Sequence, residues 1–353
     1  MLTAEDKALL EKKGISEEKI AEQLACFEKG FPFLKLDGAA SIEKGILAPA
    51  EEEMKAYLEA WDAYMQGEKK IVKFVPASGA ASRMFKNMFE FMNGENNEPT
   101  TDFEKKFFAE IEKFAFYDAL NAACEKNHNK GIKALTEEGN YKAVVECMLK
   151  DCGLNYGFLP KALLQFHKVE NEVHTPLEEH LEEGAQYATD KDKKVNIHFT
   201  VSPEHKPEFV KLINAKVPGF AEKWGVKYNV SMSEQKSSTD TVAVDMENNP
   251  YREDGKLLFR PGGHGALIQN LNDLESDVVF VKNIDNVVPD RLKEDTTLWK
   301  QVLAGILIDA QIQTFAYLRL LDSGDYNHDD IENMIRFVRH TLCTDRADIK
   351  EME

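Results

Sequence analysis

The sequence predicts an α/β fold, with a mostly parallel mixed sheet flanked by helices, N-terminal helices and a helical insertion. One observation is that several short runs rich in Val, Ile and Phe are almost continuously apolar, as expected of strands covered on both faces. Another is that helical patterns separate several of these runs, which favours parallel strands joined by helices. The runs are KIVKFVPA, VNIHFTVS, VKYNVSMS and DVVFVKNID.

Helical patterns fill most of the remaining chain and divide it into segments. Residues 1–69 are predicted to form an N-terminal helical segment, in which Ser16 is a helix N-cap and Gly30 a helix stop. Residues 70–353 are predicted to form one α/β domain. This domain contains a helical insertion at residues 94–150 and closes with C-terminal helices.

Composition narrows the classes of function. A chain of 353 residues that is 43% hydrophobic can bury a large core. The net charge of -18 argues against a nucleic-acid partner, because phosphate backbones need clustered cations. No apolar window is long enough to span a membrane, and no secretory signal is seen. Because the five cysteines form no C-x-x-C motif, we expect a cytoplasmic protein.

The first candidate site is the loop after the first strand. Small residues from Ala77 to Ser82 let the backbone curl so that successive N–H groups face an anion, and a helix follows. Arg83 would add a two-pronged guanidinium contact to phosphate. The loop matches neither GxxxxGK[ST] nor GxGxxG. The alternative is an ordinary turn with Arg83 and Lys86 in solvent.

Two charged residues form the next candidates. Lys161 follows Pro160 before an apolar run, and Asp285 stands at the end of the strand DVVFVKNID. A carboxylate at the carboxyl end of a strand, facing a phosphate loop, is a typical position for a magnesium ligand. The alternatives are a surface lysine and an Asp-Asn turn cap.

The last candidate is the segment LLFRPGGHGALIQNL. Three glycines surround one histidine before a helix, which permits positive φ angles and a close approach of the backbone to a flat or anionic ligand. An ordinary loop rarely needs so many glycines, which favours a binding role. The residues are Gly262, Gly263, His264 and Gly265.

Taken together and in this order, these segments resemble the nucleotide-sugar pyrophosphorylases, the nucleotidyltransferases of the glycosyltransferase A-type fold. The likeness is closest to the UDP-sugar pyrophosphorylases, and the chain looks like an uncharacterised bacterial branch. The family loop G-G-x-G-T-R-L lines up with residues 78–84. The later pattern, P-x-G-x-G before a helix and a strand ending V-x-N-x-D-N, lines up with PGGHGALIQNLNDLESDVVFVKNIDN and is the more specific match.

The resemblance implies a role for each candidate. Arg83 and Lys161 would be catalytic, holding the triphosphate and the phosphates near the reacting phosphorus, and Asp285 would bind Mg²⁺. Gln235, in the segment SEQKSSTDT, would read the edge of uracil. The residues that would bind the nucleotide are Ser78, Gly79, Ala80, Ala81, Ser82, Gln235, Gly262, Gly263, His264 and Gly265.

The implied reaction transfers a uridylyl group from UTP to a sugar 1-phosphate and releases pyrophosphate. It needs positioning and charge neutralisation more than a covalent nucleophile. The partners are therefore a nucleoside triphosphate, most simply a uridine nucleotide, and a sugar 1-phosphate. The sequence does not indicate the sugar or the oligomeric state.

The chain also departs from the family pattern. The loop lacks two glycines, at Ser78 and Ala81, and the likeness covers residues 70–290 only, whereas family members usually continue with further strands. One alternative is therefore a truncated or non-catalytic nucleotide-binding protein of the same fold. Another is a glycosyltransferase with a nucleotide-sugar donor, although the strand end NIDN holds one aspartate where those enzymes carry D-x-D.

A zinc site is disfavoured by the histidine spacing. His167, His174 and His180 are seven and six residues apart, and the intervals straddle the helix start at Pro176. No pair of them can therefore lie at positions i and i+4 of one helix, as zinc-binding helices require.

Overall fold

The computed structural model describes residues 2–34, 36, 38–42, 45–79, 81–170 and 172–344. The chain divides into two compact units, each discontinuous in sequence. Residues Met1–Gly30 and Lys70–Lys293 form the first, and Phe31–Lys69 and Glu294–Glu353 the second. The helical segment expected at residues 1–69 is therefore shared between the two units.

The first unit carries the sheet and most helices. Its helices are α1 (Ala4–Lys13), α2 (Glu17–Lys29), α4 (Lys86–Asn93), α5 (Asp102–Ala109), α6 (Tyr117–His128), α7 (Ile132–Glu137), α8 (Tyr141–Leu149), α9 (Pro176–Tyr187), α10 (Lys206–Trp224) and α11 (Ile268–Asn272). Its strands are β1 (Ile71–Pro76), β2 (His167–Val169), β3 (Glu172–His174), β4 (Lys194–Val201), β5 (Lys227–Glu234), β6 (Thr241–Val242), β7 (Arg252–Glu253), β8 (Lys256–Leu257), β9 (Phe259–Arg260) and β10 (Val278–Val281).

Four strands form the central sheet, in the order β10-β1-β4-β5. All three pairings are parallel, which confirms the predicted α/β fold with a parallel sheet. The antiparallel pairs of the described chain, β2-β3, β6-β9 and β7-β8, lie outside this sheet. Every residue of β1 is buried, as expected for a strand covered on both faces. β5 instead alternates between exposed and half-buried residues, because one of its faces, with Tyr228, Val230 and Met232, packs against the core and the other does not.

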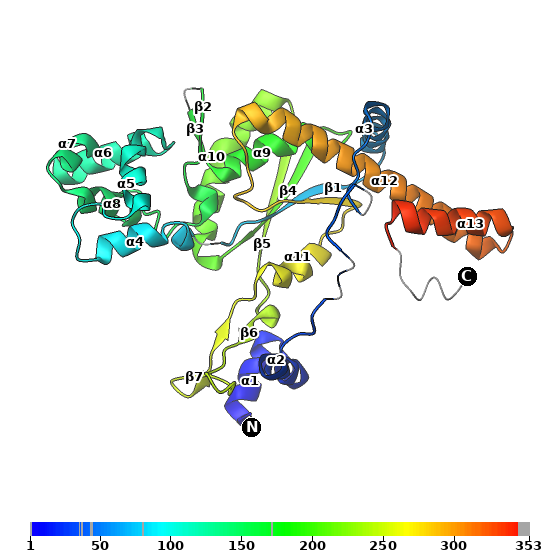
Figure 1. Ribbon diagram of the computed structural model, residues 1–353, viewed down its shortest axis with the longest axis horizontal. Coiled ribbons are helices and arrows are strands. Elements are labelled where there is room, and N and C mark those ends of the chain that lie inside the picture. Colours follow the sequence, from blue (N-terminus) through cyan, green and yellow to red (C-terminus); the bar gives the residue numbers. More distant parts are fainter. Residues whose placement is uncertain are drawn as a thin grey trace. The chain divides into compact units, whose positions relative to one another are not determined.

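Helix α9 covers one face of the sheet (Figure 1). It approaches β4 closely at Gly184, where an added Cβ would lie 2.9 Å from the Cγ1 atom of Val195 and 3.0 Å from the Cδ1 atom of Ile197. Leu177 and Leu181 of α9 pack into the same apolar core as these strand residues. Glycine at position 184 therefore lets the helix backbone rest directly on the sheet.

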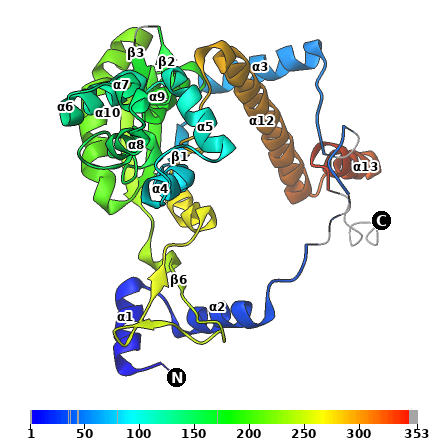
Figure 2. The same cartoon turned by 60° about the vertical axis from the view of Figure 1, so that its left-hand side comes forward.

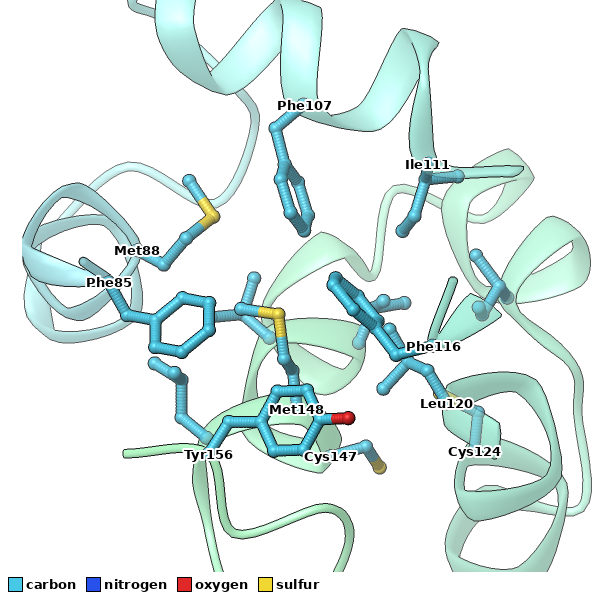
Figure 3. Close-up of a cluster of buried hydrophobic side chains, with 14 of the residues drawn as sticks. Phe85, Met88, Phe107, Ile111, Phe116, Leu120, Cys124, Cys147, Met148 and Tyr156 are labelled. Atoms are coloured by element: carbon cyan, nitrogen blue, oxygen red, sulfur yellow. The ribbon is translucent and has the colours of Figure 1, made fainter. Parts of the chain in front are cut away.

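The insertion between β1 and β4 has its own core. Helices α4 to α8 form a separate group of helices (Figure 1), built on a cluster of aromatic and aliphatic side chains. The rings of Phe85, Phe107 and Phe116 point into the middle of this cluster (Figure 3). They also line an apolar cavity of about 400 Å³, together with Met88 and Tyr156. The helical insertion is therefore a subdomain that buries its own apolar surface.

The N-terminal helices α1 and α2 pack on a small β ribbon formed by residues 240–260. Figures 1 and 2 both show them beside β6. Leu10 and Ile20 share a core with Val242 of the ribbon. Asp6 also accepts two hydrogen bonds from Arg252, at 2.8 and 2.6 Å, and this contact lowers the pKa of the Asp6 carboxyl.

The second unit is helical. It contains α3 (Glu51–Met65), almost all of α12 (Lys293–Ser323) and α13 (His328–Arg336). Helices α3 and α12 approach closely at Gly305, where an added Cβ would lie only 2.0 Å from the backbone oxygen of Tyr57. Trp61, which follows Tyr57 by four residues on α3, is completely buried. The expected C-terminal helices are present as α12 and α13.

Candidate active site at the carboxyl edge of the sheet

The order of the strands creates a switch point between β1 and β10. From β1 the chain continues to β4 and β5 on one side, whereas β10 returns to the other side of β1. In open α/β sheets, ligands bind beyond the carboxyl ends of strands where the chain order reverses in this way. Residues 77–83 follow β1 and residues 282–285 follow β10, so both segments lie at this point.

The loop after β1 is fixed by its neighbours. The N–H of Lys161 donates to the carbonyl of Gly79 at 3.3 Å, and the N–H of Ala81 donates to Leu159 O at 3.4 Å. Ala81 is completely buried in the core of the helical subdomain. Its N–H is therefore taken by Leu159 and its side chain by the core, and its contact with the nucleotide stays a prediction. Ala80, also expected to bind, lies outside the described residues.

Lys161 and Asp285 meet at the switch point. The Nζ atom of Lys161 donates to Oδ2 of Asp285 at 2.6 Å, and both side chains are partly exposed, by 26% and 31%. The segment that carries Asp285 is anchored to β1, because the N–H of Ile284 donates to Pro76 O at 3.1 Å. Two residues 124 positions apart are thus joined next to the loop that contains Gly79.

Arg83 lies at the end of the turn Ala81–Arg83, and its side chain is exposed. With Ser82 and Lys86 it borders a shallow depression of about 410 Å³. In the described part of the chain no hydrogen bond or ion pair joins Arg83 to Lys161 or Asp285. Its contact with a triphosphate stays a prediction.

Gln235 and the glycine segment come together at the other end of the edge. Gln235 follows β5, and its Nε2 donates to Oγ1 of Thr239 at 3.2 Å. An added Cβ on Gly262 would lie 2.9 Å from Thr239 O, so these two segments touch. His264 and its two neighbouring glycines, Gly263 and Gly265, are exposed, and a Cβ on either glycine would meet open space.

Positive φ angles, one of the two reasons that we expected for these glycines, do not explain them. None of the three adopts a positive φ, and Gly263 is extended, with φ -70°. Only Gly262 is required by a close backbone contact. At Gly263 and Gly265 the missing side chains leave the surface open instead.

A buried histidine that the sequence analysis considered only as a zinc ligand supports the strand end. His180 of α9 is fully buried, and its Nε2 lies 3.2 Å from the carbonyl oxygens of both Asn283 and Ile284. Burial keeps the pKa of His180 well below its usual value, so the ring is neutral and Nε2–H can donate to these carbonyls. His180 therefore holds the backbone on which Asp285 is placed.

Charged residues beneath the site form a buried network. Glu183 of α9 accepts hydrogen bonds from Lys73 at 3.0 Å and from Lys282 at 2.6 Å, and Lys73 and Glu183 are almost completely buried. Burial alone would raise the pKa of Glu183, but the ammonium groups of Lys73 and Lys282 outweigh it and lower the pKa to about 2. This network joins β1, α9 and the end of β10.

The charged and polar groups at this edge are of the kinds that bind phosphate. Lys161 offers a positive charge, and the N–H groups of Ser78 and Gly79 have no hydrogen-bond partner among the described residues. Asp285, which is paired with Lys161, offers carboxylate oxygens of the kind that hold a hydrated magnesium ion. None of the helices in the described segments is long and apolar enough to span a bilayer.

Comparisons with known proteins identify the family to which the chain belongs. A search of curated proteins and a search of solved structures returned no match. A family profile does match, and it covers residues 3–353, which is nearly the whole chain. The chain therefore belongs to the family described as a domain of unknown function, DUF4301.

Proposed function

We propose that the carboxyl edge of the sheet binds a nucleoside triphosphate and transfers its nucleotidyl group to a sugar 1-phosphate, with release of pyrophosphate. The observation that carries the proposal is the ion pair between Lys161 and Asp285, placed beside the Gly79 loop at the switch point of the sheet. A lysine, a carboxylate and free loop N–H groups are what a magnesium-assisted phosphoryl site requires.

The proposed nucleotide lies across the strand ends. Gln235 follows β5 and Asp285 follows β10, and these strands are three positions apart in the sheet. At about 4.8 Å per strand the two ends are separated by about 14 Å. The base would lie at Gln235 and the glycine segment, and the phosphates at the Gly79 loop. UTP is the preferred nucleotide in this proposal because of the resemblance around Gln235.

Lys161 and Asp285 would have different roles in the reaction. An oxygen of the sugar 1-phosphate forms a bond to the α-phosphorus, while the bond from that phosphorus to the bridging oxygen of pyrophosphate breaks. Lys161 would turn from Asp285 to the phosphates and neutralise their charge. Asp285 fits a magnesium ligand, because Lys161 engages only its Oδ2 atom. Magnesium, when bound, would supply further charge neutralisation. The cytoplasm, where both substrates are used, is the proposed location.

A second candidate is nucleotide binding without turnover. Among the described residues no strand after β10 joins the central sheet, and the chain continues as helices α12 and α13. Enzymes of the class that the sequence resembles usually carry further strands with sugar contacts. A glycosyltransferase is less favoured, because Asp285 is the single aspartate at the strand end.

Calorimetric titration with UTP, ATP and UDP-sugars, with and without Mg²⁺, tests the proposal, followed by a pyrophosphate-exchange assay. We expect Asp285→Asn to abolish the magnesium dependence, and Lys161→Met to weaken UTP binding about tenfold, as lost charge-assisted hydrogen bonds do. Asp118→Asn and Lys113→Met, two exposed charges outside the site, should change neither quantity. Unchanged binding in both site variants would remove the nucleotide from this edge, whereas binding without exchange would favour the second candidate.

Gln235→Ala is expected to reduce the preference for UTP over ATP about fivefold to tenfold, because one base-edge hydrogen bond contributes about 1 kcal/mol. Competition titrations of the two nucleotides measure this ratio. Gln269→Ala is the matched control, since Gln269 contacts Ser238 nearby but is not among the proposed base contacts. An equal loss of preference in both variants would show that base selection does not depend on Gln235 itself.

A further inference from the structure

Two histidines and two glutamates converge at the start of α9, and none of them is among the proposed nucleotide-binding residues. His167 and His174 are paired across the β2–β3 hairpin, which brings them together despite their spacing in sequence. Glu179 and Glu182 lie three residues apart on α9, so they share one face of the helix. The hairpin and the helix thus present four metal-binding side chain groups to one another.

The distances between the potential ligand atoms suit a small metal ion. The Nδ1 atom of His167 lies 3.0 Å from Oε1 of Glu179. The Nδ1 atom of His174 lies 3.8 Å from the same oxygen and 3.9 Å from Oε2 of Glu182. A tetrahedral ion with bonds of about 2.0 to 2.2 Å separates its ligands by about 3.3 to 3.6 Å. The ligand atoms of His174, Glu179 and Glu182 all lie within 4.8 Å of one another, and His167 joins this group through Oε1 of Glu179, so its side chain must move further to reach the same ion.

His174 is the observation that points to a ligand. His174 is only 4% exposed, and its Nδ1 atom has no hydrogen-bond partner in the described structure. Buried ring nitrogens are normally satisfied, and this one faces two carboxylate oxygens. The other ring nitrogen, Nε2, lies 3.8 Å from Oε2 of Glu172, a carboxylate placed like the outer partner of many metal-binding histidines.

Lys293 supplies a positive charge at the same carboxylates. Its Nζ atom lies 2.6 Å from Oε2 of Glu179, 3.0 Å from Oε2 of Glu182 and 2.6 Å from Oδ1 of Asp290. The other oxygen of Glu182 faces Nζ of Lys223 at 3.3 Å. An ion bound by Oε2 of Glu182 would replace the contact of Lys293 with that oxygen. The metal and the ammonium group of Lys293 therefore compete for the same oxygen.

Access to His174 comes from a neighbouring cavity of about 340 Å³. His174 forms part of its wall, together with Glu178 and Lys216. Lys216 is paired with Glu178 at 2.7 Å, so it contributes no contact to Glu179 or Glu182. A hydrated ion in this cavity would therefore lie against the ring of His174.

We propose that these four side chains form a binding site for a divalent transition-metal ion of the zinc class, and that the ammonium group of Lys293 competes with the metal. Imidazole nitrogen and carboxylate oxygen are ligands that such ions accept, and four protein ligands typify a structural site. The metal would tie the β2–β3 hairpin to α9. The proposed ligands are His167, His174, Glu179 and Glu182.

A calorimetric titration of the metal-free, full-length protein with Zn²⁺ alone tests this site. We expect His174→Gln to weaken binding of one ion per chain at least tenfold, as loss of a ligand does. Lys293→Met is expected to strengthen it at least tenfold, because the competing charge is removed. Lys130→Met is the control, since that exposed lysine pairs with Glu138 in the helical subdomain and lines neither the ligand set nor the cavity, and it should leave the affinity unchanged.

The gain of affinity in Lys293→Met distinguishes the site from a folding defect, because a damaged fold would lose affinity. Titration of the unaltered protein with Co²⁺ gives a second readout that needs no variant. Visible absorption of a tetrahedral ion without thiolate charge-transfer bands supports nitrogen and oxygen ligands. Thiolate bands, unchanged affinity in His174→Gln, or no ion bound by Lys293→Met would each overturn the proposal.

Discussion

Glu183→Gln is expected to lower the free energy of unfolding of the first unit by about 3 to 5 kcal/mol, the range measured when one partner of a buried ion pair is removed. Glu183 is 1% exposed and is the carboxylate that Lys73 and Lys282 share. The glutamine side chain fills the same space but leaves two ammonium groups facing a neutral amide. Chemical denaturation of both proteins at neutral pH measures the difference.

The same pair predicts how stability depends on pH. The pKa of Glu183 in the folded protein is lowered to about 2 from its ordinary value of 4.5. A group with a lowered pKa contributes stability above its unfolded pKa and loses that contribution as the pH falls towards its folded pKa. The stability difference between the natural protein and Glu183→Gln should therefore be complete above about pH 5 and shrink between pH 5 and pH 2.

Glu90→Gln is the matched control for this experiment. Glu90 pairs with Lys86 at 3.7 Å, but both side chains are mostly exposed, and such pairs contribute about 0.5 kcal/mol or less. Equal, small effects of the two substitutions would show that the buried network does not stabilise the sheet and α9 as inferred.

Gly305→Ala is expected to destabilise the helical second unit by about 3 kcal/mol. The new methyl group would lie 2.0 Å from the backbone oxygen of Tyr57, so α3 and α12 must separate. A backbone atom cannot rotate away as a side chain can, which is why the cost lies at the upper end for overpacking. Hydrogen exchange of α3 peptides measures the loss of protection.

Gly219→Ala provides the opposite expectation with the same chemical change. Gly219 lies inside α10, and an added Cβ there would meet nothing within 4 Å. Alanine should stabilise this helix by about 0.5 to 1 kcal/mol, because it reduces the freedom of the unfolded chain. If Gly305→Ala were also neutral or stabilising, the close approach of α3 and α12 would be refuted.

The sequence indicated the fold because the strands differ in period from the helices. β1 and β4 are nearly continuous apolar runs, and helices lie between the strands, so the parallel sheet could be predicted. The hairpin β2–β3 could not, since each strand has three residues and alternates little in burial. Its omission is also why the helical spacing argument for His167 and His174 did not consider their pairing across a hairpin.

The buried charge of α9 was the least predictable feature. PLEEHLEEGAQY has the composition of a solvated helix, yet its glutamates and histidine are buried. Their partners Lys73, Lys282 and Lys293 come from β1, the end of β10 and the start of α12, which no local pattern connects. Asp285, in contrast, was expected at a phosphate site because it follows a strand, and Lys161 because of the family resemblance.

The pairing of β1 also determines when the sheet can form. β1 pairs with Ile197 and its neighbours on one side and with Val278 and its neighbours on the other, so both contacts close loops of more than about 100 residues. Contacts this distant in sequence slow folding. During synthesis, the helical subdomain between β1 and β4 can bury its own core first. β1, the most buried strand, then stays without a partner on one side until β10 has been made, and we expect the nascent sheet to be most prone to aggregation in that interval.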